Sequence, residues 1–503
     1  MGSMARNYPD WKAPSADEEL LIWPQAADLL ADTVENHKQL FAADPVRVQG
    51  VSLPELRRRM RQFIGISETT PLVATGHQAE LHHPGVWIKN AVVDSMSRRL
   101  GGEAMHLAVD TDAPKHLLLR WPGGSMPITD DPSLTSAAWC AQVAPPSPSY
   151  LDQLRQSIAP AAAGWTFKPA IDAFWDSLRR LTLESPNLAS SLTNAMHQFD
   201  WALGLKYHAL LASPLWISEG FLLLVHDLLA RADETARHYN AALADYRSEH
   251  GIRSTMRPMP DLTVSEGSVE VPFWLDDLAS GTRTRPSIFR SGEGWVLQLL
   301  GGEEFYFDAS TDGWEAAGRL QRWLLQSQHR LTPRALTLML FIRLGVVDQF
   351  VHGIGGARYD QVTDRFIQLH YGMQAPHFGV ATATLYFPEA ANRERVCLPC
   401  VKQEGHRRKH AALGGRKREL VAQIESLPRR SAERSSAFFQ MHSELATQIE
   451  QSGIMSRWQE RMQETQTRER EEKTLFDREL FYAIQPRERL EMLIGRADRM
   501  IGG

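Results

Sequence analysis

Apolar residues in the first part of the chain fall into short runs and amphipathic stretches that predict alternating strands and helices. The run at 71–74 is bounded by turn residues, which indicates a buried strand, and residues 90–96 have the pattern of a helix. A second strand is expected at 104–109. Residues 15–65 are expected to be mostly helical, with Ser52 as the N-cap of one helix. This order of strands and helices is typical of an α/β fold.

Residues 113–330 interrupt this pattern. They contain a proline-rich stretch, amphipathic segments with many tryptophans, and a β-like section at 262–308 whose glycines mark hairpin turns. The α/β pattern returns with apolar runs at 338–342 and 346–351, and a further strand is expected at 380–385. A long insertion between two halves of one sheet explains this order better than a separate domain. The prediction is therefore an α/β protein whose Rossmann-like, nucleotidyltransferase-type core is split by a large insertion.

The composition becomes charged and helical from residue 393 onward. Segments 404–426 and 431–480 predict a helical hairpin, interrupted by proline at 427–428. Sparse apolar positions among many Arg, Glu and Gln residues favour a projecting coiled-coil arm that contacts a second subunit, and a hairpin lying on its own core is the alternative. The expected domains are N-terminal helices with the first half of the core at 1–112, the insertion at 113–330, the second half of the core at 331–395, and the arm at 396–503.

Composition narrows the class of protein without identifying it. Of the 503 residues, 43% are hydrophobic and 23% are charged, which is ordinary for a globular protein. No apolar run reaches the ~18 residues needed to span a bilayer, and no N-terminal segment has the pattern of a secretory signal. The three cysteines do not make a disulfide framework, so a cytoplasmic location and no membrane partner are expected. The net charge of −5 argues against nucleic acid as a partner. The basic runs near residues 407 and 416 fit the solvated face of a helix instead.

The turn after the first strand carries a dense group of chemically active residues. Residues 75–89 combine glycines, three histidines and a lysine directly before a helix. A helix N-terminus presents unpaired N–H groups and a partial positive charge, which suit an anion. His77 and His83 could donate to phosphate oxygens, and Lys89 would add positive charge. We expect a functional site here; a solvated loop whose histidines cap the helix is the alternative.

Two further segments lie where an α/β fold places ligand-binding groups. Asp110 and Asp112 directly follow the second strand, where they could bind a substrate amine, act as general base, or simply form a turn. A second glycine-rich turn at 352–360 precedes another helix, and its glycines allow backbone N–H groups to approach a ligand closely. Two such turns that bracket an insertion, both with histidine and cationic residues, favour one shared site.

These turns resemble the motifs of the bacillithiol synthase family, the cysteine-adding enzymes of bacillithiol biosynthesis. The similarity covers both ends of the core and the tail. Lys89 stands close to the family lysine. The segments that resemble family motifs are 75–81 (TGHQAEL, family T-G-Q-Q-x-G-L), 84–87 (PGVW, family G-P-L-Y), 332–337 (TPRALT, family S-P-R/N-x-x-x-R-P), 350–359 (FVHGIGGARY, family Y-V-G-G-P-G-E-I-A-Y) and 484–490 (IQPRERL, family P-x-x-x-x-Q-E-R).

The chain departs from the family pattern at three places. His77 replaces the first glutamine of the first motif, a change toward the two-histidine phosphate motif of class I synthetases and nucleotidyltransferases. Gly356 stands where the family has an acidic residue. The acidic cluster after the second strand is reduced to Asp110 and Asp112. The chain is therefore expected to be a divergent relative.

The resemblance implies a ligase that joins the carboxyl of cysteine, or a related amino acid, to the amine of glucosaminyl-malate or a similar amino-sugar conjugate. ATP with Mg²⁺ is the expected means of activating the carboxylate, and a homodimer through the C-terminal arm is expected. The alternatives are a nucleotidyltransferase or adenylate-forming enzyme acting on another small molecule, and a dimeric scaffold without activity, which the glycine at position 356 keeps open.

The expected catalytic residues are His77, His83, Lys89, Asp110 and Asp112. The expected substrate- or nucleotide-binding residues are Thr75, Gly76, Gln78, His82, Arg334, His352, Gly353, Gly355, Gly356 and Arg358.

A separate cluster of soft ligands opens the C-terminal region. Cys397, Cys400, His406 and His410 form a C-x2-C-x5-H-x3-H pattern that places both histidines on one helical face. A structural zinc site is the leading expectation. The interval before the histidines is shorter than in ordinary zinc fingers, so plain structural cysteines and a redox pair are alternatives.

Overall fold

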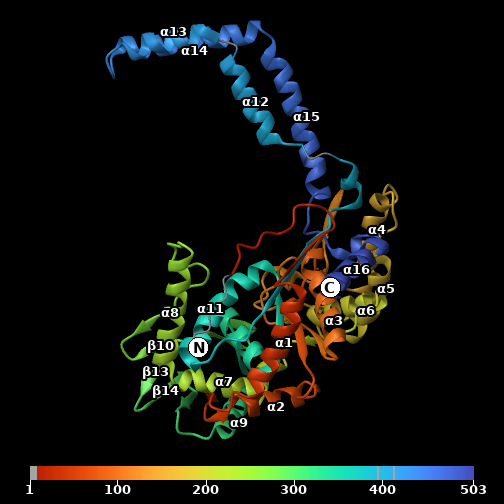
Figure 1. The fold of residues 1–503 in the computed structure, drawn as a ribbon, viewed down its shortest axis with the longest axis vertical. Coiled ribbons are helices and arrows are strands. Elements are labelled where there is room, and N and C mark those ends of the chain that lie inside the picture. Colours follow the sequence, from red (N-terminus) through yellow and green to blue (C-terminus); the bar gives the residue numbers. More distant parts are fainter. Residues whose placement is uncertain (1–7, 394–395, 412–413, 503) are drawn as a thin grey trace. The chain divides into compact units, whose positions relative to one another are not determined.

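The computed structural model describes residues 8–393, 396–411 and 414–502. The protein is mixed α/β and divides into two compact units. Figure 1 shows its ribbon coloured from red at the N-terminus to blue at the C-terminus. The first unit contains Met1–Leu385 and Arg478–Gly503, and the second contains Tyr386–Asp477. The chain thus returns to the first unit at Arg478, inside the region expected to form the arm. Within the described ranges, no helix has the length and apolar character that crossing a membrane requires.

A six-stranded mixed sheet is the centre of the first unit. Its strands run in the order β1-β18-β17-β4-β5-β8, in which β1 is antiparallel to β18 and every other pair is parallel. The strands expected at 71–74, 104–109 and 380–385 are confirmed as members of this sheet. The strands are β1 (Glu19–Trp23), β4 (Leu72–Gln78), β5 (Glu103–Val109), β8 (His208–Leu211), β17 (Gln349–His352) and β18 (Gly379–Thr384).

The order of these strands reverses beside β4. The chain moves outward from β4 to β5 and β8, and then returns to place β17 and β18 on the other side of β4. The chain therefore leaves β4 toward one side of the sheet and β17 toward the other, which makes the carboxyl ends of these two strands a topological switch point. Open α/β sheets bind their ligands at such a switch point.

Helix α3 (Pro84–Leu100) is the element that fixes one side of this switch point. His83 is its N-cap, Pro84 occupies its first turn, and Gly101 ends it in the left-handed conformation. Its residues from Pro84 to Ser97 are buried, since the helix packs against β4, β5 and β18 and against α16 (Arg487–Gly502), which lies beside α3 in Figure 1. The helix expected at 90–96 is therefore confirmed as the middle of a longer one.

The segment expected as an insertion contributes to the main sheet, because β8 lies within residues 113–330. The β-like section expected at 262–308 is confirmed. The other strands of this segment and its border form three small sheets. The first pairs β6 (Leu118–Trp121) with β7 (Gly124–Pro127), and the second joins β11 (Phe273–Asp277), β12 (Thr282–Thr284) and β16 (His329–Pro333). The third consists of β9 (Val264–Ser265), β10 (Ser268–Glu270), β13 (Ser287–Ser291), β14 (Gly294–Gln298) and β15 (Glu304–Phe307). The helices of the segment are α4 (Pro148–Ala162), α5 (Ile171–Glu184), α6 (Leu188–Ala202), α7 (Glu219–Ala230), α8 (Ala232–Glu249) and α9 (Gly313–Gln326).

The N-terminal segment is less helical than expected. Ser52 caps α2 as predicted, since its hydroxyl accepts from the backbone N–H of Glu55 at 3.4 Å. However, residues 15–65 also contain β1, whose pairing with β18 decides its conformation. The other elements around the core are α1 (Ala26–Phe41), β2 (Arg47–Val48), β3 (Val51–Ser52), α2 (Leu53–Phe63), α10 (Ala335–Phe341) and α11 (Ile354–Tyr371).

A buried carboxylate ties the start of the sheet to helix α2. Asp348, directly before β17, lies 2.5 Å from Nη2 of Arg57 and 2.6 Å from Nη2 of Arg61, and all three side chains are buried. The backbone N–H of Leu72 donates to the same carboxylate at 2.8 Å. Burial alone would raise the pKa of Asp348, but Arg57, the ring of His37 and Arg61 lower it to about 2. This group therefore aligns the first residues of β4 with those of β17.

The second unit consists mainly of helices, which pack in pairs. Helix α12 packs against α15, and α13 packs against α14 around buried Leu420, Ile424 and Met441. The expected hairpin is thus present, but each of its two arms is divided into two helices. These helices are α12 (Leu398–Ala411), α13 (Gly414–Glu425), α14 (Ala432–Gln451) and α15 (Ile454–Leu475).

Candidate functional site

A cavity of about 720 Å³ lies in the first unit at the carboxyl ends of β4 and β17. Its wall includes the beginnings of α3 and α11, so two helix N-termini and two strand ends meet at the switch point of the sheet. Both glycine-rich turns therefore contribute to one site, as the sequence predicted. The predicted residues that line it are Gly76, His77, Gln78, His83, Lys89, Asp112, Arg334, His352, Gly353, Gly355 and Gly356.

Lys89 places a buried amine at the end of β4. Its Nζ donates to the carbonyl oxygen of Gly76 at 2.8 Å, and only 2% of the residue is exposed. Burial lowers the pKa of Lys89 to about 7. The amine therefore changes its charge close to neutral pH, and an anion in the cavity would favour the charged form.

The state of Lys89 predicts how anion binding depends on pH. We expect the affinity for sulfate, whose charge is constant, to fall about tenfold between about pH 6 and about pH 8, because the amine loses its proton as the pH rises through about 7. Calorimetry at several pH values measures this. The variant Lys89→Met should lose the dependence, whereas Lys206→Met, at an exposed lysine, should keep it. Equal pH dependence in both variants would contradict the assignment.

His83 has a fixed tautomer. Its Nδ1 accepts from the backbone N–H of Gly85 at 3.1 Å, so the ring proton must lie on Nε2. Burial, followed by Arg478, His82 and Lys89, lowers the pKa of His83 to about 3. His83 is therefore a neutral N–H donor at the cavity wall, able to stabilise an oxygen that gains negative charge.

Half-buried His77 lies near the buried carboxyl group of Glu80. Nδ1 of His77 lies 3.8 Å from a carboxylate oxygen of Glu80, beyond hydrogen-bond distance, and this nitrogen is buried without a hydrogen-bond partner among the described residues. Burial is the main cause that lowers the pKa of His77 well below its ordinary value, with Lys89 next. Burial raises the pKa of Glu80 to about 8, so this side chain carries a proton at neutral pH. Sequence reasoning did not select Glu80, because only burial makes it differ from a surface glutamate.

His352 has the geometry of an oriented base. Its Nε2 lies 2.7 Å from Oδ2 of Asp360, and Nη1 of Arg343 lies 2.9 Å from the same oxygen. Burial alone would raise the pKa of Asp360, but Arg343 and His352 outweigh burial and hold it below its ordinary value. The ionised Asp360 fixes the proton of His352 on Nε2, so Nδ1 is an acceptor, and no described residue donates to it. The sequence predicted His352 as a binding residue and did not identify Asp360.

The absence of a side chain at Gly356 has a steric reason in this arrangement. A Cβ atom at this position would lie 2.9 Å from Nδ1 of His352, closer than real Cβ contacts. The ring cannot move aside easily, because Asp360 holds it and Phe350 and Phe378 pack against it. The glycine at position 356 therefore makes room for the ring of His352.

Four predicted residues do not line the cavity as the structure describes it. Asp110 accepts from the backbone N–H and the hydroxyl of Ser213 at 2.9 and 2.6 Å, so the structure places it behind the wall, and its role as a base or amine ligand stays a prediction. Thr75 donates to the carbonyl of Val351 at 2.8 Å inside the sheet. The two others are buried His82, whose ring packs against those of His77 and His106, and exposed Arg358, which binds Asp10 and the carbonyl of Trp11.

Long-range folding adds cationic and aromatic residues to the wall. Arg334 donates to Glu270 at 2.7 Å and lies over the ring of Trp274, as does Arg285. Arg478 comes from the segment that returns after the second unit and donates to the carbonyl of Ala383 at 3.0 Å. No local pattern connects Arg285, Trp274 and Arg478 with the two turns, which explains why the sequence did not indicate them.

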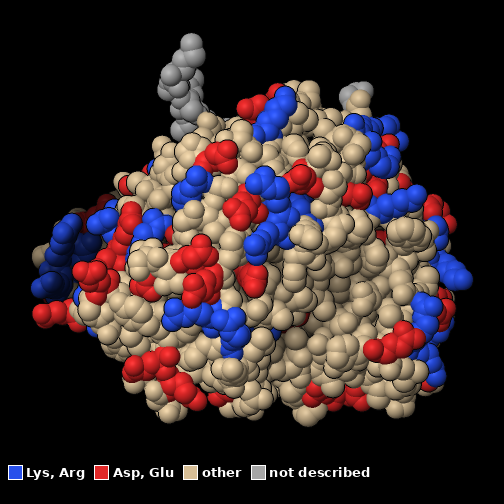
Figure 2. Space-filling view, turned by 90° about the horizontal axis from the view of Figure 1, so that it is seen from below, with Lys and Arg blue, Asp and Glu red and all other residues tan. Residues whose placement is uncertain are grey.

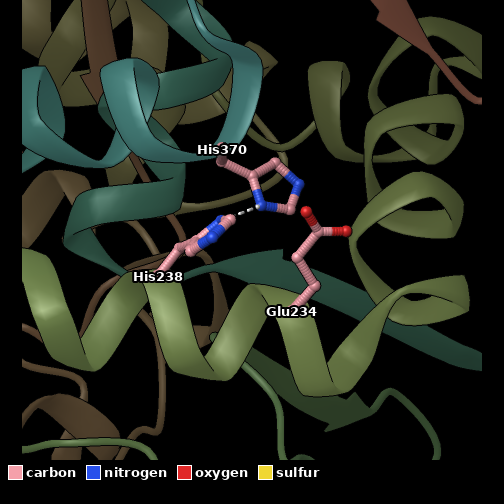
Figure 3. Close-up of side chains that lie close together, drawn as sticks. All are labelled: Glu234, His238 and His370. Atoms are coloured by element: carbon pink, nitrogen blue, oxygen red, sulfur yellow. Dashed lines mark hydrogen bonds between the residues drawn. The ribbon is translucent and has the colours of Figure 1, made fainter.

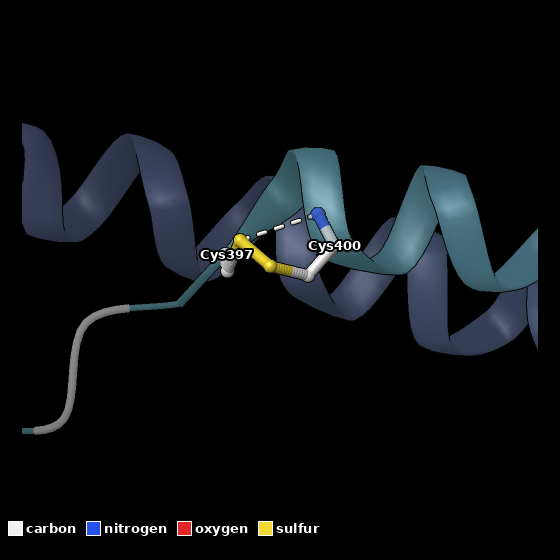
Figure 4. The surroundings of a disulfide bond; sticks show 2 residues. All are labelled: Cys397 and Cys400. Atoms are coloured by element: carbon white, nitrogen blue, oxygen red, sulfur yellow. Dashed lines mark hydrogen bonds between the residues drawn. A yellow bond between two sulfur atoms is a disulfide. The ribbon is translucent and has the colours of Figure 1, made fainter.

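The predicted metal ligands lie in the second unit. Cys397 and Cys400 form a disulfide at the start of α12, where the backbone N–H of Cys400 donates to the sulfur of Cys397 at 3.2 Å (Figure 4). Bonded sulfurs are not thiolate ligands, so the zinc prediction applies only to the reduced pair. The side chains of His406 and His410 lie outside the described residues. The disulfide agrees with the structural and redox alternatives.

No protein-family model matches the chain, and none of the curated proteins matches its sequence. The resemblance to bacillithiol synthase therefore stays a prediction that depends on the motifs and on the cavity they form.

Proposed function

We propose that this protein is an amide-forming ligase of the bacillithiol synthase type, which joins cysteine or a related amino acid to glucosaminyl-malate or a similar amino-sugar conjugate. The observation that carries this proposal is the switch-point cavity, where Lys89, His77 and His83 meet the N-termini of α3 and α11. A titrating amine, neutral imidazoles and helix N–H groups together suit a phosphate-bearing ligand.

The order of the parallel strands supports a Rossmann-like core. In the order β8-β5-β4-β17-β18, the chain begins at the centre, moves outward on one side and then continues on the other, as in doubly wound nucleotide-binding folds. We therefore retain a nucleotidyltransferase-type core, with a coiled-coil arm built from α12–α15, as part of the proposal. Because one fold supports many reactions, the proposed reaction depends on the residues of the cavity and not on the fold.

The wall offers residues for ATP and Mg²⁺. ATP with Mg²⁺ would supply the group that activates the carboxylate for attack. Arg334, Lys89 and the first turn of α11 would hold its phosphates, because they bring positive charge and N–H donors to one wall. Asp112, which accepts from Gln78 at 3.0 Å through Oδ2, offers a carboxylate to the cation.

Two histidines divide the proton chemistry in this proposal. His352 accepts the proton of the attacking amine on Nδ1, while Asp360 holds the ring and stabilises the imidazolium that forms. His83 donates its Nε2–H to the carboxyl oxygen that gains charge. The amine nitrogen forms a bond to the carboxyl carbon, and the bond from that carbon to the activating group breaks.

A nucleotidyltransferase or adenylate-forming enzyme acting on another small molecule is the second candidate. The observation that favours it is the presence of two neutral imidazoles, His77 and His83, beside one helix N-terminus. The scaffold alternative depended on Gly356, and the steric need for glycine beside His352 supports an enzyme instead.

Mass spectrometry of a reaction with cysteine and glucosaminyl-malate tests the proposal. We expect the mass of the cysteinyl amide with purified protein, ATP and Mg²⁺, and no product without ATP. Lys89→Met should abolish the product, whereas Lys206→Met should form it at the normal rate. Nucleotide binding without amide product would favour the second candidate, and neither binding nor product would contradict both.

The expected partners and location belong to the same proposal. A homodimer through the second unit is supported by exposed Phe438 and Phe439 on α14, which light scattering can test after their replacement by serine. On the face shown in Figure 2, basic and acidic side chains are interspersed, and its described residues form no continuous basic strip. The absence of a nucleic-acid partner and the cytoplasmic location stay predictions.

A further inference from the structure

Helices α8 and α11 bring together a cluster of side chains that the proposed reaction does not use. Glu234 and His238 lie four residues apart on one face of α8, and His370 lies in the last turn of α11 (Figure 3). The switch-point cavity lies at the other end of α11, beside Gly353 and Gly355. None of these three side chains lines the cavity, although its wall extends to Thr363 on α11 and to Tyr239, the residue after His238.

The three side chains point toward a common point, as Figure 3 shows. Nδ1 of His238 lies 3.2 Å from Nδ1 of His370, and one ligand atom from each of the three residues lies within 4.8 Å of the others. Two imidazole nitrogens bound to one tetrahedral zinc ion at ~2.0–2.1 Å would be separated by about 3.3 Å. The observed separation therefore fits two ligands of one ion without rearrangement of the helices.

The protonation of the cluster also suits a metal ion. Burial is the main cause that lowers the pKa of His370, to about 3, and burial also lowers the pKa of His238. Both rings are therefore neutral at pH 7, the state in which histidine binds a metal. His370 is only 7% exposed, and its Nε2 has no hydrogen-bond partner among the described residues, so the ring is not held by another polar contact at that nitrogen.

The surrounding charges leave room for a cation. Arg231 and Arg237 are positive groups whose charges act on the two rings, and the guanidinium of Arg231 lies 2.5 Å from Asp227 and 3.8 Å from Glu234. The guanidinium of Arg231 is thus paired with two carboxylates, so its charge is compensated beside the two neutral rings. Glu234 is 38% exposed on its side chain, so water can reach the remaining coordination position.

We propose that Glu234, His238 and His370 bind one divalent transition-metal ion of the zinc type, with water completing a four-coordinate site. Two imidazoles and one carboxylate are a ligand set that zinc accepts. The ion would join α8, from the predicted insertion, to α11, whose first turn lines the cavity. The metal ion would link the two helices in addition to the ion pair between Arg365 of α11 and Glu249 of α8. This site does not depend on the proposed ligase reaction.

Metal binding to the intact chain tests the proposal. Chelator-treated protein is dialysed against Zn²⁺ or Co²⁺, and the bound metal is counted by mass spectrometry. We expect one ion per chain, a visible absorption band with Co²⁺, and a higher unfolding temperature with either ion. His238→Gln and His370→Gln should each weaken binding by about 100-fold or more, since loss of even an outer-shell partner costs 10–100-fold. His238 is only partly buried, so its variant remains informative if the His370 variant does not fold.

Two control variants separate this cluster from other ligands. His250→Gln changes an exposed histidine at the end of α8 and should bind the metal like the unaltered protein. The double variant Cys397→Ser, Cys400→Ser removes the sulfurs of the second unit and should also retain the ion. A hydrogen bond between the two rings would give the same 3.2 Å separation without a metal. Absence of stoichiometric metal, or its loss only in the cysteine variant, would overturn the proposal.

Discussion

Replacing His352 by glutamine should lower turnover by about 10²–10⁴-fold, which is the usual contribution of a general base. The glutamine amide can still donate to Asp360 in place of Nε2–H, but it has no nitrogen that accepts a proton in place of Nδ1. The affinity for substrates should therefore change little. Single-turnover kinetics with a separate binding measurement would show this loss in the chemical step.

Gly356→Ala provides an independent change at the same base. The added Cβ would lie 2.9 Å from Nδ1 of His352 and would displace the ring or block the nitrogen, so turnover should fall by up to about 100-fold. His208→Gln, at an exposed histidine that pairs with Glu103, is the matched control and should leave turnover unchanged. Because burial lowers the pKa of His352, the loss of activity on the acid side of the pH profile should begin only below the ordinary range of histidine. Full activity in both the His352 and Gly356 variants would refute the role of His352 as base.

Asp348→Ala should lower the free energy of unfolding by about 3–5 kcal/mol, because it leaves Arg57 and Arg61 charged, buried and without their partner. It also removes the acceptor of the Leu72 N–H at the start of β4. Urea unfolding followed by circular dichroism measures the effect. Asp152→Ala, which removes an exposed carboxylate from its contact with Arg179, should cost less than about 1 kcal/mol. Equal effects of the two changes would mean that the buried group does not contribute as we infer.

The same carboxylate predicts how stability depends on pH. Its pKa is about 2 in the folded protein and 3.8 ordinarily, so the folded state favours the ionised form by about 2 kcal/mol. This stabilisation is complete above the ordinary pKa and is lost as the pH falls through about 2. The Asp348→Ala variant should lack this part of the acid dependence, which unfolding curves between about pH 5 and about pH 2 would reveal.

The strands and the first glycine- and histidine-rich turn were predictable because their signals are local. Residues 71–74 and 104–109 are short apolar runs, and burial requires such runs in a parallel sheet. The turn at 75–89 concentrates glycine, histidine and lysine between a strand and a helix, so its position at the carboxyl edge of the sheet follows from connectivity alone. The second turn at 352–360 was identified for the same reason.

Other site residues were not predictable because their roles depend on partners distant in sequence. Arg478 reaches the wall only after the second unit, and Arg285 and Trp274 come from the segment expected as an insertion. Asp360 lies eight residues from His352, and only the path of α11 brings its carboxylate to Nε2 of that ring. His82 and Asp110 have suitable chemistry for the site, but His82 is buried away from the cavity wall and Asp110 is occupied by Ser213. The direction of a side chain depends on tertiary packing, which a local pattern does not record.

The sequence by itself determined the α/β class, the approximate positions of β4, β5 and β18 in the core and the two turns that line the cavity, because backbone hydrogen bonding and burial impose short-range periodicity. Only the tertiary structure decided that β1 and β8 complete the sheet, that Lys89, His83 and His352 line one cavity, and that His238 meets His370. These outcomes depend on contacts between segments far apart in the chain. Burial at those contacts sets each group's charge, and with it the chemistry that the group can perform.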